Sequence, residues 1–326
     1  MREWIHVEEL KIGMYIRIQG SWISHPFVKN EFLIKSSEDI QKIADAGLKK
    51  ILVDFSKSKI DREENSDLIS PDVPQEFEPG ELIPLPLREA IQDKNLTSEQ
   101  KASVIRTCSV AIMKRLLEAP TPENVYKAKE DLYEVVDCIL AEDEITAYLT
   151  KITDHDLYTY THSVNVGILS LLLARKYFRY SNAHDLRELG AGFFLHDLGK
   201  TRVNPAILNK QGRLKDIEML EVQTHPKHSF DILREANQVT AESKIITLQH
   251  HEREDGSGYP DGLRGEEIHI YAQICSIADI YDALTCDRPY RQRMSPFQAL
   301  KLIKKEISGH VQQNLFENLI FLLGEN

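Results

Sequence analysis

Histidines and aspartates recur in a fixed order between residues 162 and 279 of this 326-residue chain. Most of them stand in or beside apolar helical stretches, where burying an uncompensated polar group costs about 2–7 kcal/mol. A single buried histidine can find a backbone partner, but so many imidazoles beside carboxylates are best explained by cations that they coordinate. The pattern therefore predicts a site for two metal ions with the ligands His162, His196, Asp197, His225, His250, His251 and Asp279.

The donor types narrow the choice of metal. Imidazole mixed with carboxylate, and no thiolate, suits Fe, Mn, Zn, Co or Ni better than Mg or Ca. We therefore expect two divalent transition-metal ions, with Fe or Mn as the first choice and Zn, Co or Ni as the others.

Each member of the set has a simpler explanation when it is taken alone. His162 shares a helical face with apolar residues, which is typical of a satisfied core histidine. Asp197 follows the apolar segment 190–195 and is equally well explained as a helix-end carboxylate. His250 and His251 end a helix, where histidine complements the helix dipole. Only the conjunction of these residues favours metal coordination.

Composition excludes several classes of function. The formal net charge of −11 argues against a partner that is polymeric nucleic acid or an anionic membrane surface. No apolar run approaches the roughly 18 residues of a membrane span, and no signal-peptide pattern opens the chain. The four cysteines have no C-x-x-C spacing, which favours reduced thiols and a cytoplasmic location.

Hydrophobic periodicity divides the chain into three parts. Residues 1–56 are expected to form a small α/β N-terminal domain with strands over 14–18, 31–35 and 50–55 and a helix over 37–46. Residues 57–96 are charged and proline-rich, which predicts a linker. Residues 97–326 are expected to form an all-helical catalytic domain, so that the fold class is mainly α.

Within the third part the apolar spacing is helical almost throughout. The one long, glycine-rich interruption is at 252–270. Helices are predicted over 160–178, 185–198, 216–236, 241–251, 271–287 and 296–307.

Two strings in this region resemble a known family. The run His196-Asp197-Leu198-Gly199-Lys200 resembles the H-D-x-G-K signature of HD-superfamily phosphohydrolases, and residues 250–263 resemble the H-H-E-x-x-D-G-x-G-Y-P-x-G-L element of the HD-GYP family. Segments 224–226 and 278–285 also fit the family. Residues 1–56 resemble the short domain of unknown function that often precedes HD-GYP domains.

The resemblance implies a helical HD-type bundle that hydrolyses the bacterial messenger cyclic di-GMP to pGpG, GMP or both, through a hydroxide activated by two metals. It implies that one metal is held by His162, His196, Asp197 and Asp279, and the other by His225, His250 and His251, with Asp197 bridging. Lys200 would face the scissile phosphate. The remaining substrate contacts implied are Gly258, Tyr259, Pro260, Arg288 and Arg291.

One position departs from the pattern of some relatives. Those relatives bind a third metal through a Glu four residues before the first histidine, where this chain has Tyr158. Two metals are therefore favoured over three.

The chemistry of phosphodiester hydrolysis needs groups of these kinds. A water between two cations about 3.5–4 Å apart is a hydroxide near neutral pH. A lysine such as Lys200 balances charge that builds on the phosphoryl oxygens. Arg288, Arg291 and Arg293 in isolation are better explained as helix-end arginines, but beside a metal centre they favour an anion clamp. No residue is assigned as proton donor to the leaving oxygen.

Several alternatives stay open. The substrate could be a hybrid cyclic dinucleotide such as cyclic GMP-AMP, or the chain could be a catalytically silent receptor of cyclic dinucleotides. An HD-type hydrolase of nucleotide tri- or tetraphosphates is disfavoured by the His250-His251 pair and the loop of Gly258, Tyr259 and Pro260. The N-terminal domain is expected to regulate or to dock a protein partner, and a homodimer is a fair expectation on general grounds.

Overall fold

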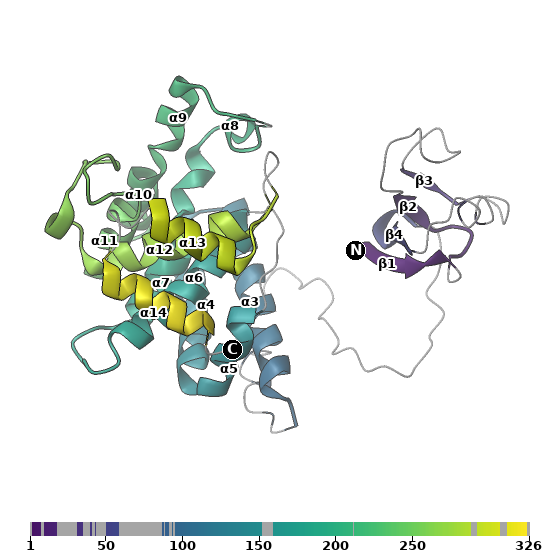
Figure 1. The fold of residues 1–326 in the computed structure, drawn as a ribbon, viewed down its shortest axis with the longest axis horizontal. Coiled ribbons are helices and arrows are strands. Elements are labelled where there is room, and N and C mark those ends of the chain that lie inside the picture. The colour runs from purple at the N-terminus through teal and green to yellow at the C-terminus, as the bar shows by residue number, and fades with distance from the viewer. Residues whose placement is uncertain are drawn as a thin grey trace. The chain divides into compact units, whose positions relative to one another are not determined.

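The computed structural model describes residues 2–7, 10–17, 31–34, 40, 43, 50–58, 87, 89–90, 93, 95–151, 159–210, 212–287, 292–306 and 312–324. The chain divides into two units, residues 1–73 and residues 74–326. The first holds a small β-sheet with helical residues at 40 and 43, and the second holds helices α3 to α14 (Figure 1), so the expected fold class, mainly α behind a small α/β domain, is confirmed.

The N-terminal unit contains an antiparallel sheet of four strands in the order β1-β4-β2-β3. The strands are β1 (Arg2–His6), β2 (Tyr15–Arg17), β3 (Glu31–Leu33) and β4 (Lys50–Asp54). Alternating apolar residues such as Ile16, Ile51 and Val53 are buried in its core. β1 was not predicted, because its charged residues carry no strand pattern and its pairing with β4 places it in the sheet. The predicted helix over 37–46 lies mostly outside the described residues.

The second unit is built on α6, which is buried along nearly its whole length. It packs against five other helices of the unit, because a helix that is apolar all round must be covered on every side. The helices are α3 (Ser98–Glu118), α4 (Pro122–Ala141), α5 (Asp143–Lys151), α6 (Thr159–Tyr177), α7 (Leu186–Leu195), α8 (Pro205–Leu208), α9 (Asp216–Val222), α10 (His225–Glu235), α11 (Ala241–Gln249), α12 (Ile270–Thr285), α13 (Pro296–Glu306) and α14 (Gln313–Gly324), with 3₁₀ turns η3 (Leu198–Arg202) and η4 (Gly265–Glu267).

Side-chain caps fix where several helices begin. The hydroxyls of Thr97, Thr121 and Thr240 accept hydrogen bonds from backbone N–H groups in the first turns of α3, α4 and α11. Asp185 does the same for two N–H groups of α7. Each cap satisfies donors that have no partner within their own helix.

Two helices of the structure have other bounds than the sequence predicted, and both differences concern the site. The predicted helix over 216–236 is two helices, because Pro226 stands in the first turn of α10, where its missing N–H and fixed φ favour a helix start. The predicted helix over 185–198 ends at Leu195, and Asp197 lies in the turn that follows. Both breaks place functional side chains at helix ends.

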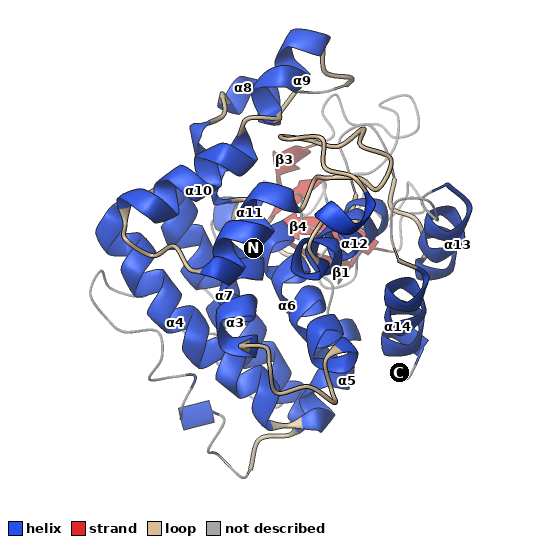
Figure 2. Ribbon diagram, turned by 90° about the vertical axis from the view of Figure 1, so that its left-hand side faces the viewer, coloured by secondary structure: helices blue, strands red, loops and turns tan. Residues whose placement is uncertain are grey.

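Helices α8 and α9 stand at one end of the helical unit, beyond α10 (Figure 2). Within the described part of the chain, none of the helices combines the length and apolarity that a bilayer crossing would require.

Candidate metal centre

The seven predicted ligands come from five separate elements and meet in one place. His162 lies on α6 and Asp279 in the middle of α12. His225 is the first residue of α10. The other four lie just after helices: His196 and Asp197 after α7, and His250 and His251 after α11. Helix ends and buried faces thus bring together residues that are up to 117 positions apart in the sequence.

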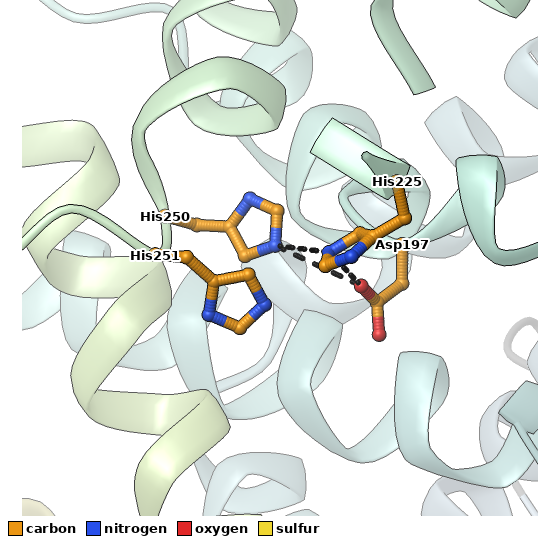
Figure 3. Close-up of side chains that lie close together, drawn as sticks. All are labelled: Asp197, His225, His250 and His251. Carbon is orange, nitrogen blue, oxygen red and sulfur yellow. Dashed lines mark hydrogen bonds and ion pairs between the residues drawn. The ribbon is translucent and has the colours of Figure 1, made fainter. Parts of the chain in front are cut away.

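The donor atoms form two groups. The first group is His162, His196 and Asp279, and the second group is Asp197, His225, His250 and His251; within each group the donor atoms lie within 4.8 Å of one another. Figure 3 shows the four side chains of the second group turned toward a common point. The structure thus brings the seven residues together, while their role as ligands stays a prediction.

Asp197 lies between the two groups. Its Oδ1 is 3.0 Å from His225 Nε2 and 3.7 Å from His250 Nε2. Its Oδ2 is 3.3 Å from His162 Nε2 and 3.4 Å from His196 Nε2. One carboxylate therefore presents one oxygen to each group, which is the geometry of a bridging ligand.

In four of the histidines Nδ1, the ring nitrogen that faces away from the site, already makes a hydrogen bond. The Nδ1 atoms of His196, His225 and His250 donate to backbone carbonyls at 2.7–3.1 Å, and Nδ1 of His162 donates to Asp282 Oδ2 at 2.7 Å. A carbonyl or carboxylate only accepts, so Nδ1 of each ring carries a proton and Nε2 is the atom left to bind a metal. All four Nε2 atoms then point into the site, as metal ligation requires.

Buried atoms without hydrogen-bond partners show that these residues fit a cation. Among the described residues, Nε2 of His162, Nε2 of His196 and Oδ1 of Asp197 are buried and have no hydrogen-bond partner. Nε2 of His225 lies 3.2 Å from Nε2 of His250, so two lone pairs face each other. Such atoms are costly to bury unless something positive lies between them, and divalent cations satisfy this condition.

The pKa values of the histidines shift in different directions in the two groups. Burial lowers the pKa of His162, but the nearby carboxylates of Asp197, Asp279 and Asp282 outweigh burial and raise it well above its usual value. Burial, with the neighbouring His250, lowers the pKa of His251 well below the usual value, and burial also lowers that of His225. The pKa of Asp197 is lowered well below its ordinary range, because Lys200 and His196 outweigh its burial.

The turn after α7 is held tightly against α10. Ser229 Oγ accepts from the Gly199 N–H at 2.7 Å and donates to the His196 carbonyl at 2.9 Å. A Cβ on Gly199 would lie 2.1 Å from the His225 carbonyl oxygen, so only glycine allows this approach. Lys200 Nζ pairs with Asp197 Oδ2 and remains about one-fifth exposed.

A loop from 252 to 264 covers the second group. The carboxylate of Glu252, which is buried, accepts the backbone N–H groups of Asp261, Gly262 and Leu263 at 2.7–3.2 Å. A Cβ on Gly258 would meet backbone atoms of residues 251–253 at 2.4–2.6 Å, which explains the glycine. The Tyr259 ring consequently stacks on His251, with ring centroids 4.7 Å apart.

Sequence reasoning gave no role to three residues that build the site: Asp282, Ser229 and Glu252. Asp282 carried a usable signal, because it is a second aspartate on the same apolar helix, one turn after Asp279. Glu252 lies inside the recognised string but was assigned no function. Ser229 carried no signal, because a serine on a mixed helix face is ordinary.

Three residues discussed from the sequence lie outside the described residues: Arg288, Arg291 and Tyr158. Of the other predicted substrate contacts, Tyr259 lies on the second group as described above, and Gly258 and Pro260 flank it in the same loop.

Comparisons with known proteins agree with this geometry. The family model for the HD domain matches residues 173–315, and a domain of unknown function, DUF3391, matches residues 4–128. The cyclic di-GMP phosphodiesterase PA4108 of Pseudomonas aeruginosa is 32% identical over 331 residues, covering 99% of this chain and 77% of that protein. The chain belongs to the HD-GYP family.

Two further family relatives are informative. A 3′3′-cGAMP-specific phosphodiesterase of Vibrio cholerae is 33% identical over 208 residues, which are 64% of this chain and 43% of that protein. The solved structure of an HDG"Y"P protein from Bdellovibrio bacteriovorus covers 99% of this chain and is itself covered in full, with a TM-score of 0.62 at 16% identity. That likeness concerns the fold.

Proposed function

We propose that this HD-GYP protein is a metal-dependent phosphodiesterase that hydrolyses cyclic di-GMP. The observation that carries the proposal is the pair of donor groups joined by Asp197, with histidine Nε2 atoms turned inward. The similarity to PA4108, which spans 99% of this chain and 77% of that protein, supports the same substrate. Cyclic di-GMP carries two phosphodiester bonds, so the product is pGpG after one cleavage and GMP after the second.

His162, His196, Asp279 and one oxygen of Asp197 would hold one divalent cation, and His225, His250, His251 and the other oxygen a second. Bound divalent cations supply Lewis acidity, which lets water attack a phosphodiester at neutral pH. Fe or Mn is the first choice from the mixed nitrogen and oxygen donors, with Zn, Co or Ni as the alternatives. Tyr158 in place of a glutamate supports two ions rather than three.

The protein's own groups position the substrate. Lys200 keeps its ammonium at the mouth of the site beside Asp197, where it can balance charge on the phosphoryl oxygens. Tyr259 forms one wall through its stack on His251, between Gly258 and Pro260. Arg288 and Arg291 are proposed to bind the phosphates in bidentate fashion, since guanidinium matches phosphate geometry.

A hybrid cyclic dinucleotide is the second candidate substrate, because the Vibrio cholerae relative is named for 3′3′-cGAMP. Both substrates offer the same phosphodiester chemistry, and they differ in one base.

Product analysis tests the proposal directly. The Mn²⁺-loaded chain is incubated separately with cyclic di-GMP and 3′3′-cGAMP, and the products are separated by chromatography, with chelator-treated protein as control. We expect pGpG or GMP from cyclic di-GMP, and none after chelation. Binding without turnover of either compound would instead identify a receptor, and preferential turnover of 3′3′-cGAMP would establish the second candidate.

The N-terminal domain is proposed to regulate the helical domain or to dock a protein partner, with boundaries at 1–56, a linker over 57–96 and the catalytic domain over 97–326. The cytoplasm and a homodimer remain the proposed compartment and assembly. Removing residues 1–56 and comparing turnover and thermal stability tests the regulatory role, which unchanged values would contradict.

A further inference from the structure

A line of hydrogen bonds runs from α3 to the first group. Arg106 on α3 donates from Nη2 to Asn165 Oδ1 at 2.7 Å. Asn165 donates from Nδ2 to Asp282 Oδ1, also at 2.7 Å. The other oxygen of Asp282 accepts the Nδ1 proton of His162 at 2.7 Å. The line thus joins helices α3, α6 and α12 and ends on a predicted ligand.

Each link determines the geometry of the next. The amide of Asn165 uses its oxygen toward Arg106 and its nitrogen toward Asp282, so it has one orientation only. Asp282 accepts on both oxygens, which fixes its plane. His162 is then held in one tautomer and one ring orientation, and partners of this kind typically change metal affinity about 10–100-fold.

The groups in the line are buried, where such bonds are strong. Arg106, Asn165 and Asp282 are 5%, 7% and 4% exposed. A buried guanidinium is a costly choice for an interior position, and an apolar residue of similar volume often serves stability as well or better. The position of Arg106 therefore calls for a reason beyond packing.

Arg106 also lies in a different matched segment from most of the site. It falls within residues 4–128, which match the domain of unknown function, whereas the HD domain matches 173–315. Together with Asn165, Asp282 and Thr285 it lines a cavity between α3, α5, α6, α12 and α14. The line therefore connects the end of the N-terminal matched segment to the cation site.

We propose that Arg106 and Asn165 are positioning residues that fix His162 through Asp282, so that the placement of α3 sets the cation affinity of the first group. This inference rests on the proposed function, because it requires that the first group hold a cation. A purely structural role for Arg106 would change the unfolding temperature and leave the affinities of both ions unaltered.

Calorimetric titration of Mn²⁺ into the metal-free chain tests the proposal. In Arg106→Met and Asn165→Leu we expect the affinity for one of two ions to fall about 10–100-fold, with the other unchanged. Lys101→Met is the matched control, since Lys101 is also a cation on α3 but pairs with Glu142 away from the line. It should bind both ions as the wild type does.

A double variant identifies the shared path. Asp282→Asn should weaken the same ion, and Arg106→Met added to it should weaken that ion no further, because both changes break one line. Arg106 lines a cavity, so the surrounding side chains can adjust to Arg106→Met. If that variant misfolds, Asn165→Leu breaks the same line of hydrogen bonds. Two tightly bound ions in either folded variant would overturn the inference alone, whereas a wild type without Mn²⁺ binding would overturn the proposed function with it.

Discussion

The two donor groups are built from the same residue types, and yet the pKa of His162 in the first group is shifted in the opposite direction from those of His225 and His251 in the second. In the first group, His162 is surrounded by three carboxylates, which raise its pKa well above the usual value. In the second group, His225 and His251 are buried beside other histidines, and their pKa values are lowered. Burial lowers the pKa of all three imidazoles, and the carboxylates beside His162 reverse the net shift.

This difference has a chemical consequence. A histidine binds a metal only through a lone pair, so a protonated ring must lose its proton first. If the groups bind cations as proposed, His225 and His251 in the second group need lose no proton at neutral pH, whereas His162 in the first group must give one up. Asp197 lies between the two groups, so its substitution should affect both of them.

Asp197→Ala is expected to have the largest effect. It removes an oxygen from each group at once, so hydrolysis of cyclic di-GMP should fall to background and both ions should be lost. Metal analysis and product chromatography measure this, with circular dichroism to confirm the helical content. The control is Asp137→Ala, an exposed residue paired with Arg187. A variant that retains turnover would refute the assignment.

Gly199→Ala should affect the second group more than the first. The new Cβ would meet the His225 carbonyl oxygen at 2.1 Å and the Ser229 nitrogen at 2.3 Å, so α10 must move. We expect a loss of about 3 kcal/mol in unfolding free energy from overpacking. The ion of the second group should be lost before that of the first. Gly324→Ala, which has no atom within 4 Å of the new Cβ, serves as control, and equal behaviour of the two variants would contradict the packing explanation.

The dependence of metal affinity on pH should differ between the groups. Because the pKa of His162 is raised well above its usual value, the metal-free ring is protonated at pH 7, and the affinity of the first group should fall about tenfold for each pH unit below that pKa. The lowered pKa values of His225 and His251 keep those rings neutral at pH 7. The affinity of the second group should therefore vary less steeply with pH than that of the first. Mn²⁺ titrations from pH 6 to 9 measure both, and parallel curves would contradict the difference.

Glu252→Gln should give the smallest effect. The glutamine retains one oxygen for the loop N–H groups but loses the charge and the second acceptor, which should cost roughly 1–2 kcal/mol of stability. Tyr259 would then stack less firmly on His251, so the second ion should bind a few-fold more weakly and the first ion unchanged. Thermal unfolding and Mn²⁺ titration measure this; Glu254→Gln, a partly buried carboxyl two residues further on, is the control. An equal effect on both ions would contradict it.

Much of the helical unit was predictable because its signals are local. Periodicity placed α6, α11, α12 and α13 within a few residues of their observed bounds. The order of histidines and aspartates identified the residues that converge, since few other arrangements justify burying so many of them. Pro226 also carried a local signal, a helix start, which was overlooked.

What could not be predicted depends on contacts between distant segments. Asp282 matters because α6 brings His162 to it, and Ser229 matters because Gly199 lets α10 approach. Strand β1 exists because β4 pairs with it. In each case the determining partner lies more than 25 positions away, beyond the reach of any window of local sequence.

The outer nitrogens of three histidines are tied to backbone carbonyls near the same helix ends, so the rings stand in their final orientation before any ion arrives. Loading such a cage needs no refolding, and exchanging one ion for another needs none either. Metals that share a preference for imidazole and carboxylate would therefore meet the same donors already in place.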